Sequence, residues 1–437
     1  MLYGRKQFKF VFIGAGSSSF TLRLVGDILG EDFIENAEIA LVDINKVLLG
    51  EVKSAVSNLV SYAGKHFSVK SHADFHDALP GADFVFFIYA TGGYAAWKKD
   101  IEICTRHGVY QSVGDTIGPG GIIRTLRTIP VALEIAHEME KVCPDAWVIN
   151  YTNPEGALCL ALQTHTKIRS FGLCHGTPDT ARDLATHVFH VDPARLSYRA
   201  GGVNHLTWFT DLTIDGEDVY PRLFQMLSES GYASKEPVSF DLFRIFGLYP
   251  APGDRHVEEF FPNYLKKRVM DERNLAWKNN DFVVIDGWRE KSRAHLEDVM
   301  KNNKGYEDFL KGSGETSSHF MRSLATGKTT TEMVNVVNRG YIENISDGII
   351  VEVPTFVDSF GLHPQKIGRL PEGIAAKCDA LGREYLLAVE AARTGDPKLA
   401  LQAFMLDPLS ANCEYPERLF EELLVENVSL LPSCWNL

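Results

Sequence analysis

The chain has 437 residues and a formal net charge of −13, with 45% hydrophobic and 23% charged residues. This length exceeds what one ordinary hydrophobic core organises, so we expect two closely packed domains of a globular protein. The negative charge argues against a general binder of nucleic acid or of an anionic membrane, because either would be repelled on average.

Cysteine usage and the lack of long apolar runs indicate the cellular compartment of the protein. No run of apolar residues approaches the length needed to cross a bilayer, and the first run, Phe8–Ile13, ends in glycines without a cleavage site. We therefore expect neither a membrane span nor a signal peptide. The seven cysteines are odd in number and follow no pairing pattern, which favours a reduced, cytoplasmic protein.

Short apolar runs alternate with helical patterns in the first part of the chain. Apolar residues recur at helical spacing over Leu22–Leu29 and Leu126–Met139. The expected strands are Phe8–Ile13, Ile39–Val42, Phe84–Ile88, Trp147–Ile149 and Phe171–Leu173. Strands separated by helices imply crossovers, so residues 1–195 are predicted to form a Rossmann-type, doubly wound parallel sheet of an α/β protein.

The pattern changes after about residue 200, where Trp, Phe and Tyr become frequent. Tyr249–Arg255 is expected to be a long loop, and the end of the chain from Pro371 onward is expected to be largely helical. Residues 196–437 are therefore predicted to form a second, α+β domain, to which the family resemblance described below assigns the substrate, a metal and oligomerisation.

A glycine-rich turn follows the first expected strand. Gly14 allows a tight turn, and Gly16 lets backbone amides approach a pyrophosphate at the start of the next helix, where Ser17 and Ser18 lie. Asp43 ends the second strand and could accept hydrogen bonds from both ribose hydroxyls, which favours NAD over NADP. These features predict an NAD site; the alternative is a glycine turn that binds nothing.

Several polar segments follow the later strands, at the edge where such sheets place their ligands. Cys174 follows the fifth strand, and His205 lies about thirty residues further on. A thiolate and an imidazole could hold a divalent metal, with substrate oxygens or water at its other positions. The alternative is core packing, since cysteine is among the most buried residue types.

Two loops each carry one candidate acid. Asp115 lies in the glycine-dense segment 114–121, and Asp254 lies in segment 252–256. If both loops lined one cleft, they would supply an acid and a base. The alternative is that each carboxylate bonds its own loop backbone, which is the common role of Asp in turns.

Taken together, these segments resemble family 4 of the glycoside hydrolases, which are NAD- and metal-dependent. The resemblance covers nearly the whole chain and includes segments 14–17, 114–121, 150–154, 174–175, 204–205, 253–256, 338–344 and 351–354. It implies a fold like that of lactate and malate dehydrogenases, with Mn²⁺ held at Cys174 and His205. A homodimer or homotetramer is also implied.

The residues after the metal cysteine sort this family by substrate. Cys174 is followed by His175, not by the acid or amide of the phospho-glycosidases. The segment 174–177 resembles the subgroup associated with α-glucuronidases, and segment 253–256 resembles α-galacturonidases. The substrate implied is thus an α-glycoside of a hexuronic acid, with a neutral α-glucoside or α-galactoside as the alternative.

The resemblance also implies roles for individual side chains. Hydrolysis would proceed by NAD-dependent oxidation at sugar C3, proton removal at C2, elimination, addition of water and re-reduction. Asp115 would be the general acid and Asp254 the base at C2. The side chains expected to bind sugar hydroxyls or the uronate carboxylate are Asn153, His175, Thr177, Arg255 and Arg124.

Two other functions fit part of the same pattern. A plain NAD-dependent dehydrogenase of a sugar or hydroxy acid would use the same glycine loop, but it would form NADH in proportion to substrate. An NAD-binding regulatory protein would leave Cys174 and His205 without a metal.

Overall fold

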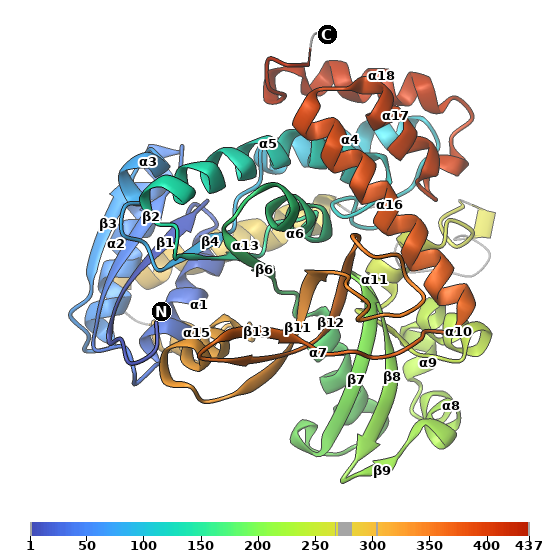
Figure 1. The fold of residues 1–437 in the computed structure, drawn as a ribbon, viewed down its shortest axis with the longest axis horizontal. Coiled ribbons are helices and arrows are strands. Elements are labelled where there is room, and N and C mark those ends of the chain that lie inside the picture. Colours follow the sequence, from blue (N-terminus) through green and yellow to red (C-terminus); the bar gives the residue numbers. More distant parts are fainter. Residues whose placement is uncertain (1, 267, 270–281, 303–304, 436–437) are drawn as a thin grey trace.

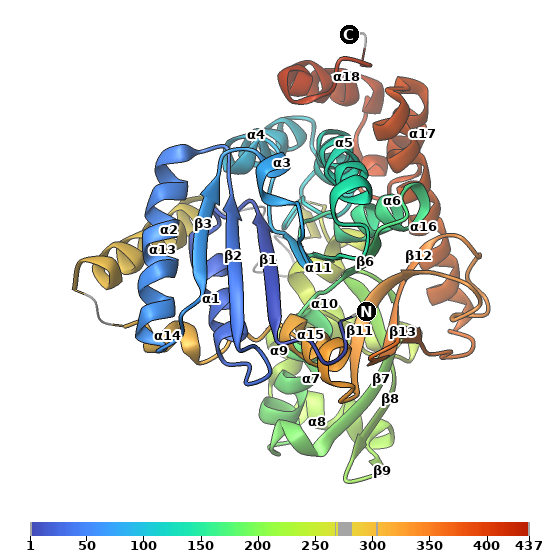
Figure 2. The same ribbon diagram turned by 60° about the vertical axis from the view of Figure 1, so that its left-hand side comes forward.

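The computed structural model describes residues 2–266, 268–269, 282–302 and 305–435. A parallel sheet forms its first half, with strands in the order β3-β2-β1-β4-β5-β6. Their bounds are β1 Gln7–Ile13, β2 Asn36–Val42, β3 Ser68–His72, β4 Phe84–Phe87, β5 Trp147–Asn150 and β6 Arg169–Gly172. Figure 2 shows β1, β2 and β3 side by side, with helices on either side of the sheet. The predicted α/β, Rossmann-type fold is confirmed.

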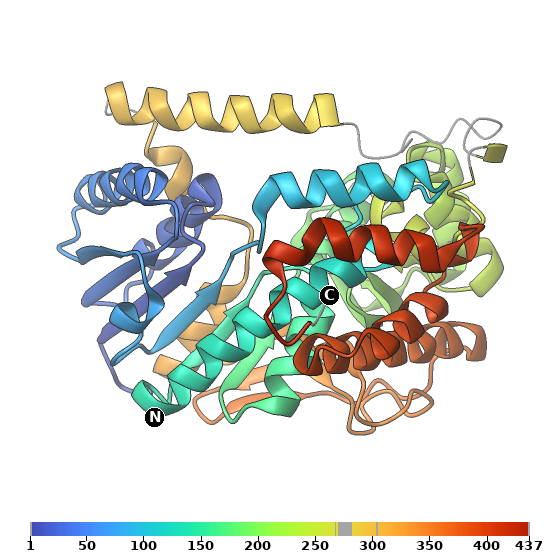
Figure 3. The same ribbon diagram turned by 90° about the horizontal axis from the view of Figure 1, so that it is seen from above.

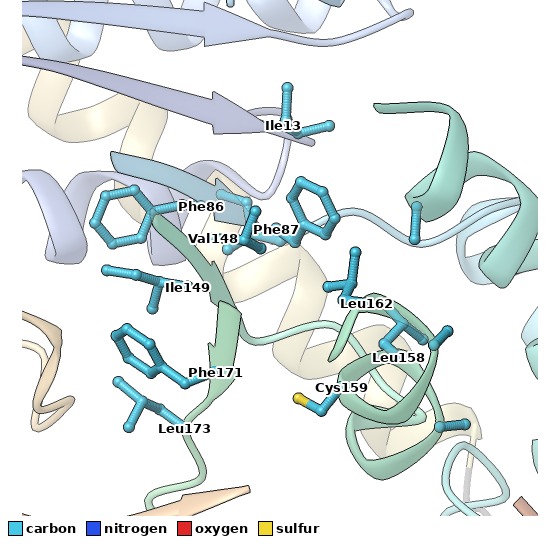
Figure 4. Close-up of a cluster of buried hydrophobic side chains, with 14 of the residues drawn as sticks. Ile13, Phe86, Phe87, Val148, Ile149, Leu158, Cys159, Leu162, Phe171 and Leu173 are labelled. Atoms are coloured by element: carbon cyan, nitrogen blue, oxygen red, sulfur yellow. The ribbon is translucent and has the colours of Figure 1, made fainter. Parts of the chain in front are cut away.

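Aromatic and aliphatic side chains explain why these runs become central strands. The rings of Phe12 and Phe86 stack across β1 and β4 with centroids 4.6 Å apart. Phe171 continues this apolar layer toward β6 (Figure 4). The sequence analysis missed β3, because its residues SVKSH are polar and only partly buried, so no apolar run marks this edge strand.

The crossover helices begin where the strands end. They are α1 Ser18–Leu29, α2 Lys46–Tyr62, α3 Phe75–Ala78, α4 Gly93–Arg106, α5 Gly118–Val142, α6 Glu155–His165 and α7 Gly176–Asp183. The helical patterns at Leu22–Leu29 and Leu126–Met139 lie within α1 and α5. Loops at the carboxyl ends of the parallel strands therefore share one edge of the sheet, where ligands bind in this architecture.

The sheet continues beyond β6 into antiparallel strands. β11 (Thr330–Val337) meets β6 at Asn335 and Gly172, and β12 (Ile350–Asp358) meets β7 at Glu352 and Gly202. The other strands are β7 Leu196–Val203, β8 Leu206–Ile214, β9 Glu217–Asp218, β10 Pro250–Ala251 and β13 Gly361–Pro364. The second half of the chain is thus hydrogen-bonded directly to the end of the parallel sheet (Figure 1).

Helices of the second half return to the first. α13 (Phe282–Asn302) crosses one side of the molecule and packs against α1 and α2 (Figure 3). α16, which begins just after Pro371 as expected, packs on α5 and α6. The remaining helices are α8 Tyr220–Glu229, α9 Tyr232–Lys235, α10 Pro237–Phe246, α11 Asp254–Val257, α14 Glu307–Leu310, α15 Ser317–Thr326, α16 Glu372–Thr394, α17 Pro397–Leu406 and α18 Pro416–Asn427.

For the second half of the chain, the sequence predicts a long loop at Tyr249–Arg255 and a domain boundary at residue 195. The expected loop Tyr249–Arg255 contains the short strand β10 and the start of α11. The division at residue 195 stays a prediction, and α13 contacts the first half although it lies beyond that division.

Within the described residues, no helix combines the length and apolar character that a membrane span requires.

Candidate active site

The glycine loop is locked to the ends of β1 and β2. Gly14 has a φ of +90°, and a Cβ there would lie 2.5 Å from the Cα of Tyr89. The N–H of Gly16 donates to Asp43 Oδ2 at 2.8 Å, and a Cβ on Gly16 would lie 2.5 Å from the same oxygen. Asp43 also accepts the N–H of Asn45 at 2.8 Å. Only glycine fits at both positions of this turn.

A groove of about 1330 Å³ starts at this loop. Ser17 and Ser18, at the start of α1, form one end, and neighbouring walls come from α2, Tyr94 and α13. The cationic side chains that line it are Arg23, Arg289, Arg293 and Lys301. The acidic side chains that line it are Glu51, Asp286, Glu290 and Glu297, so the groove as a whole is not cationic. A glycine turn that admits a close ligand and a helix N-terminus together fit the pyrophosphate of a dinucleotide.

Three possible metal ligands lie together beyond the parallel strands. One ligand atom each of Asp115, His205 and His256 lies within 4.8 Å of the other two, and this is the one such group among the described residues. The imidazole rings of His205 and His256 have centroids 4.1 Å apart. A carboxylate and two imidazoles suit a divalent transition metal such as Mn²⁺ or Zn²⁺.

Thr116 sets the protonation of His205. Its hydroxyl donates to Asp115 Oδ1 at 2.8 Å, so its lone pair is left to accept from His205 Nδ1, also at 2.8 Å. The proton of His205 then lies on Nδ1, and Nε2 keeps a free lone pair. Burial lowers the pKa of His205 to about 4, so the ring is neutral at pH 7, as a metal ligand must be.

Asp115 is held as a carboxylate. Burial alone would raise its pKa, but the charge of Arg124 and the hydrogen bond from the Thr116 hydroxyl bring the pKa below its ordinary value. Its Oδ2 also accepts from Asn153 Nδ2 at 3.0 Å. An ionised carboxylate is a ligand or an acceptor, whereas a general acid carries a proton when it acts; the expected role of Asp115 as the general acid stays a prediction.

Asn153 and Arg124 form the wall beside that carboxylate. Arg124, on α5, donates from Nε to the backbone oxygen of Asn153 at 2.9 Å. Asn153 follows β5, so its amide faces Asp115 from the carboxyl edge of the sheet. These two residues are therefore at the site, as expected, with Arg124 acting on Asp115 through its charge.

Cys174 follows β6 at the same edge but does not join the Asp115–His205–His256 group. Its Sγ accepts the N–H of Gly176 at 3.4 Å. Burial, with the nearby carboxyls of Glu155 and Glu352, raises the pKa of its thiol well above the ordinary value. The thiolate would therefore form only when a cation is bound beside it.

A buried acidic pair lies behind Cys174. The amide of Asn335 donates to Glu155 at 2.6 Å, and the hydroxyl of Thr177 donates to Glu352 at 3.0 Å. Thr177 is itself buried, so the structure directs this expected substrate-binding side chain toward the protein core. Burial raises the pKa of Glu155 well above its ordinary value and that of Glu352 to about 7.

This pair makes stability depend on pH. Because the folded-state pKa of Glu352 is raised, the folded protein loses stability as pH rises from about 4.5 to about 7. We expect Glu352→Gln to reduce that slope, which for one such group is at most about 1.4 kcal/mol per pH unit. Urea unfolding at several pH values measures it, with the exposed Glu343→Gln as the control; equal slopes in both variants would contradict the prediction.

Asp254 has its carboxylate turned toward α10. Its two oxygens accept the N–H groups of Val238 and Ser239 at 2.7 and 2.6 Å, and its own N–H donates to Glu236. A carboxylate that accepts two backbone hydrogen bonds at a helix N-terminus caps that helix. Each oxygen keeps a further lone pair, and the expected role of Asp254 as the base at C2 stays a prediction.

The other expected carboxylate-binding residues lie near these segments. His175 pairs with Glu315 through Nδ1 at 3.0 Å, and this hydrogen bond raises the pKa of the half-exposed imidazole. Arg255 is partly buried on α11, beside His256. His175 is adjacent in sequence to Cys174, so its ring lies near the carboxyl end of β6.

The sequence analysis missed His256 and the contacts that hold its segment. Glu258 accepts from the hydroxyl of Ser112, and Glu259 accepts the N–H groups of Val113 and Gly114 at 2.9 Å each. Through these hydrogen bonds, the two acids connect the segment after His256 to the loop before Asp115. The sequence signal available was the run His-Val-Glu-Glu directly after Arg255, which places a histidine and two acids next to the predicted Asp254.

Comparison with known proteins shows the family to which the chain belongs. The model of the family 4 glycosyl hydrolases matches residues 9–189, and the model of the C-terminal domain of that family matches residues 200–410. An α-galacturonidase of Thermoanaerobacter italicus is 34% identical over 95% of each chain. An α-galactosidase of Bacillus subtilis is 33% identical over 92% of this chain and 93% of its own.

Solved structures agree with the fold. A Bacillus subtilis structure superposes with a TM-score of 0.85 at 27% identity, covering 96% of this chain and all 100% of that one. A 6-phospho-α-glucosidase from gut microorganisms, solved with NAD and Mn²⁺, gives 0.82 at 20% identity over 98% and 99%. Lactate dehydrogenase from Eimeria maxima gives 0.52 at 13% identity over 90% and 96%, so the expected dehydrogenase-like fold is confirmed. The chain belongs to family 4 of the glycosyl hydrolases.

Proposed function

We propose that the protein hydrolyses α-glycosides of a hexuronic acid, with NAD and a divalent metal such as Mn²⁺ as cofactors. One observation carries this proposal: the glycine loop, Asn153 and Cys174 all follow parallel strands and lie at one edge of the sheet. The Asp115–His205–His256 group is joined to that edge through Asn153. A glycine loop and a metal-ligand cluster connected to the same edge of one sheet fit glycoside cleavage by transient oxidation of the sugar.

The substrate class rests on the chemistry of the residues near Cys174. Relatives named α-galacturonidase are 31–34% identical across nearly the whole chain. The half-exposed ring of His175, whose pKa is raised by the hydrogen bond to Glu315, offers an N–H donor that would suit a uronate carboxylate. Arg255 is the second candidate for this contact, with a guanidinium able to bind a carboxylate in bidentate fashion. The α-galactosidase relative keeps a neutral α-galactoside as the alternative substrate.

Both cofactors fit the side chains that are present. When bound, NAD would accept and return the hydride of sugar C3, and the metal would polarise the resulting ketone as a Lewis acid. Gly14 and Gly16 admit the pyrophosphate, and Asp43 lies where ribose hydroxyls would bind. His205 offers a neutral imidazole and Cys174 a thiol that loses its proton to a bound cation.

The protein's own groups then orient the sugar and place charge around it. The amide of Asn153 holds Asp115 and stands where it can reach a sugar hydroxyl. The carboxylate of Asp115 balances the positive charge of the metal, and Arg124 holds that carboxylate ionised. Asp254, by capping α10, fixes the short helix that carries Arg255.

Hydrolysis of matched aryl glycosides tests the proposal. Aryl α-galacturonide, α-glucuronide and α-galactoside are compared in heavy water with NAD, Mn²⁺ and a thiol. We expect aglycone release from a uronide at least about tenfold faster than from the galactoside, a difference of about 1.4 kcal/mol in the transition state. Deuterium should enter at C2, and no net NADH should form.

Each other outcome points to a different function. Faster cleavage of the neutral galactoside would overturn the uronate assignment and leave the glycosidase. Formation of NADH in proportion to substrate, without aglycone release, would support a sugar dehydrogenase instead. Aglycone release without deuterium at C2 would exclude the oxidation–elimination route.

A further inference from the structure

The proposed function assigns metal ligation to His205 and Cys174, and the individual role of His256 in the neighbouring cluster is open to a sharper inference. The short helix α11 (Asp254–Val257) brings the ring of His256 against His205, with ring centroids 4.1 Å apart and planes inclined by 44°. A ring nitrogen of His256, a ring nitrogen of His205 and a carboxylate oxygen of Asp115 are all within 4.8 Å of one another. No other residues of the described ranges bring three such groups so close.

The bonding of the two rings leaves nitrogen lone pairs without protein partners. His205 Nδ1 is taken by Thr116, so Nε2 is free to bind a ligand. His256 Nδ1 is buried and has no hydrogen-bond partner among the described residues. A buried polar atom without a partner is costly, and a bound cation would satisfy it. Two adjacent imidazoles beside a carboxylate are hard to explain by packing alone, since apolar rings would fill the same space without that cost.

The segment that carries His256 is fixed before any ligand arrives. Asp254 binds the N-terminus of α10 on one side, through Val238 and Ser239. Glu259 binds the loop before Asp115 on the other side, through two backbone N–H groups. Rigid support of this kind is what holds metal ligands in a productive geometry.

We propose that His256 is a ligand of the divalent metal, together with His205 and the carboxylate of Asp115. The ion then has two neutral nitrogen ligands and one anionic oxygen ligand, a set that suits Mn²⁺, Fe²⁺ or Zn²⁺. Cys174 lies outside this group and would approach the ion as a further ligand. This proposal rests on the metal dependence within the proposed function, and it adds the residue that completes the site.

Mn²⁺ binding to the purified, thiol-reduced protein with NAD tests the proposal. Free Mn²⁺ is counted by its electron paramagnetic resonance signal during titration of wild type, H256Q and H205Q. Both variants are expected to weaken Mn²⁺ binding by roughly 10–100-fold. The control is H319Q, at a histidine that pairs with Glu332 away from this site, and its affinity should match wild type. NAD affinity should be unchanged in all three.

The outcomes separate this proposal from the function on which it rests. If wild type binds Mn²⁺ and the affinity of H256Q for Mn²⁺ is within about twofold of the wild-type value, His256 is not a ligand, whereas the proposed function stands. If wild type binds no divalent metal, the metal dependence itself fails. Loss of C2 deuterium exchange in H256Q with unchanged Mn²⁺ affinity would make His256 a base and would also overturn the proposal.

A measurement on the wild-type protein covers the case in which H256Q does not fold. Electron spin-echo modulation of bound Mn²⁺, with isotopically labelled histidine, counts the imidazole nitrogens that coordinate the ion. Two coupled imidazoles are expected, from His205 and His256. A single coupled imidazole would contradict the assignment.

Discussion

Asp115→Asn is expected to lower kcat/KM by roughly 10²–10³-fold on aryl glycosides with good and with poor leaving groups alike. The structure holds Asp115 as a carboxylate between Arg124 and two imidazoles, and an amide there would remove the negative charge that faces the metal. The loss would fall on every substrate that needs the metal, whatever its leaving group. The measurement is kcat/KM for a series of aryl leaving groups of graded pKa.

The same series separates the two roles considered for Asp115. A general acid matters most when the leaving group is a poor one, so a loss confined to poor leaving groups would show that Asp115 is the general acid. Mn²⁺ titration of Asp115→Asn provides an independent readout, since a weaker affinity is expected only for a group that faces the ion. Arg124→Lys keeps a positive charge beside Asp115 and is the matched variant, with a smaller expected loss.

Gly14→Ala is expected to lower the free energy of unfolding by about 2–5 kcal/mol and to weaken NAD binding at least about tenfold. An alanine would need a φ of +90°, and its Cβ would lie 2.5 Å from the Cα of Tyr89, a backbone atom of the neighbouring segment. Neither the turn nor that segment can move without opening the loop. Urea unfolding and fluorescence titration with NAD measure the two effects.

The control for Gly14→Ala is Gly50→Ala. Gly50 lies in the interior of α2, is exposed, and has no atom within 4 Å of the position of an added Cβ. Alanine there should stabilise the helix by about 0.5–1 kcal/mol and leave NAD affinity unchanged. If Gly14→Ala retained wild-type stability and NAD affinity, the glycine loop would not be the dinucleotide site.

Local sequence signals were enough to predict most strands and the glycine loop in the first half of the fold. The five predicted strands formed because each is a run of buried apolar residues, and Phe12 stacks on Phe86 across two of them. The glycine loop was predictable because Gly14 and Gly16 lie between such a strand and a helix. β3 was missed because an edge strand is only partly buried and carries no apolar run.

The candidate site was only partly predictable, since its members come from distant segments. Asp115, Asn153, Arg124 and His205 were predicted and do lie together. Asp254 was predicted for its charge, but sequence order could not show that Val238 and Ser239 lie within reach of its carboxylate. His256 was overlooked because nothing near it in sequence reveals the 4.1 Å contact with His205.

The sequence by itself determined the parallel sheet, the glycine loop and the family, because these depend on runs and motifs within a few residues of one another. Only the tertiary structure decided which groups share the site and what charge they carry. Asp115 stays ionised because folding brings Arg124 beside it, and Asp254 caps α10 because folding turns its carboxylate there. Charge and hydrogen bonding act across space, so they follow from contacts that the order of residues does not contain.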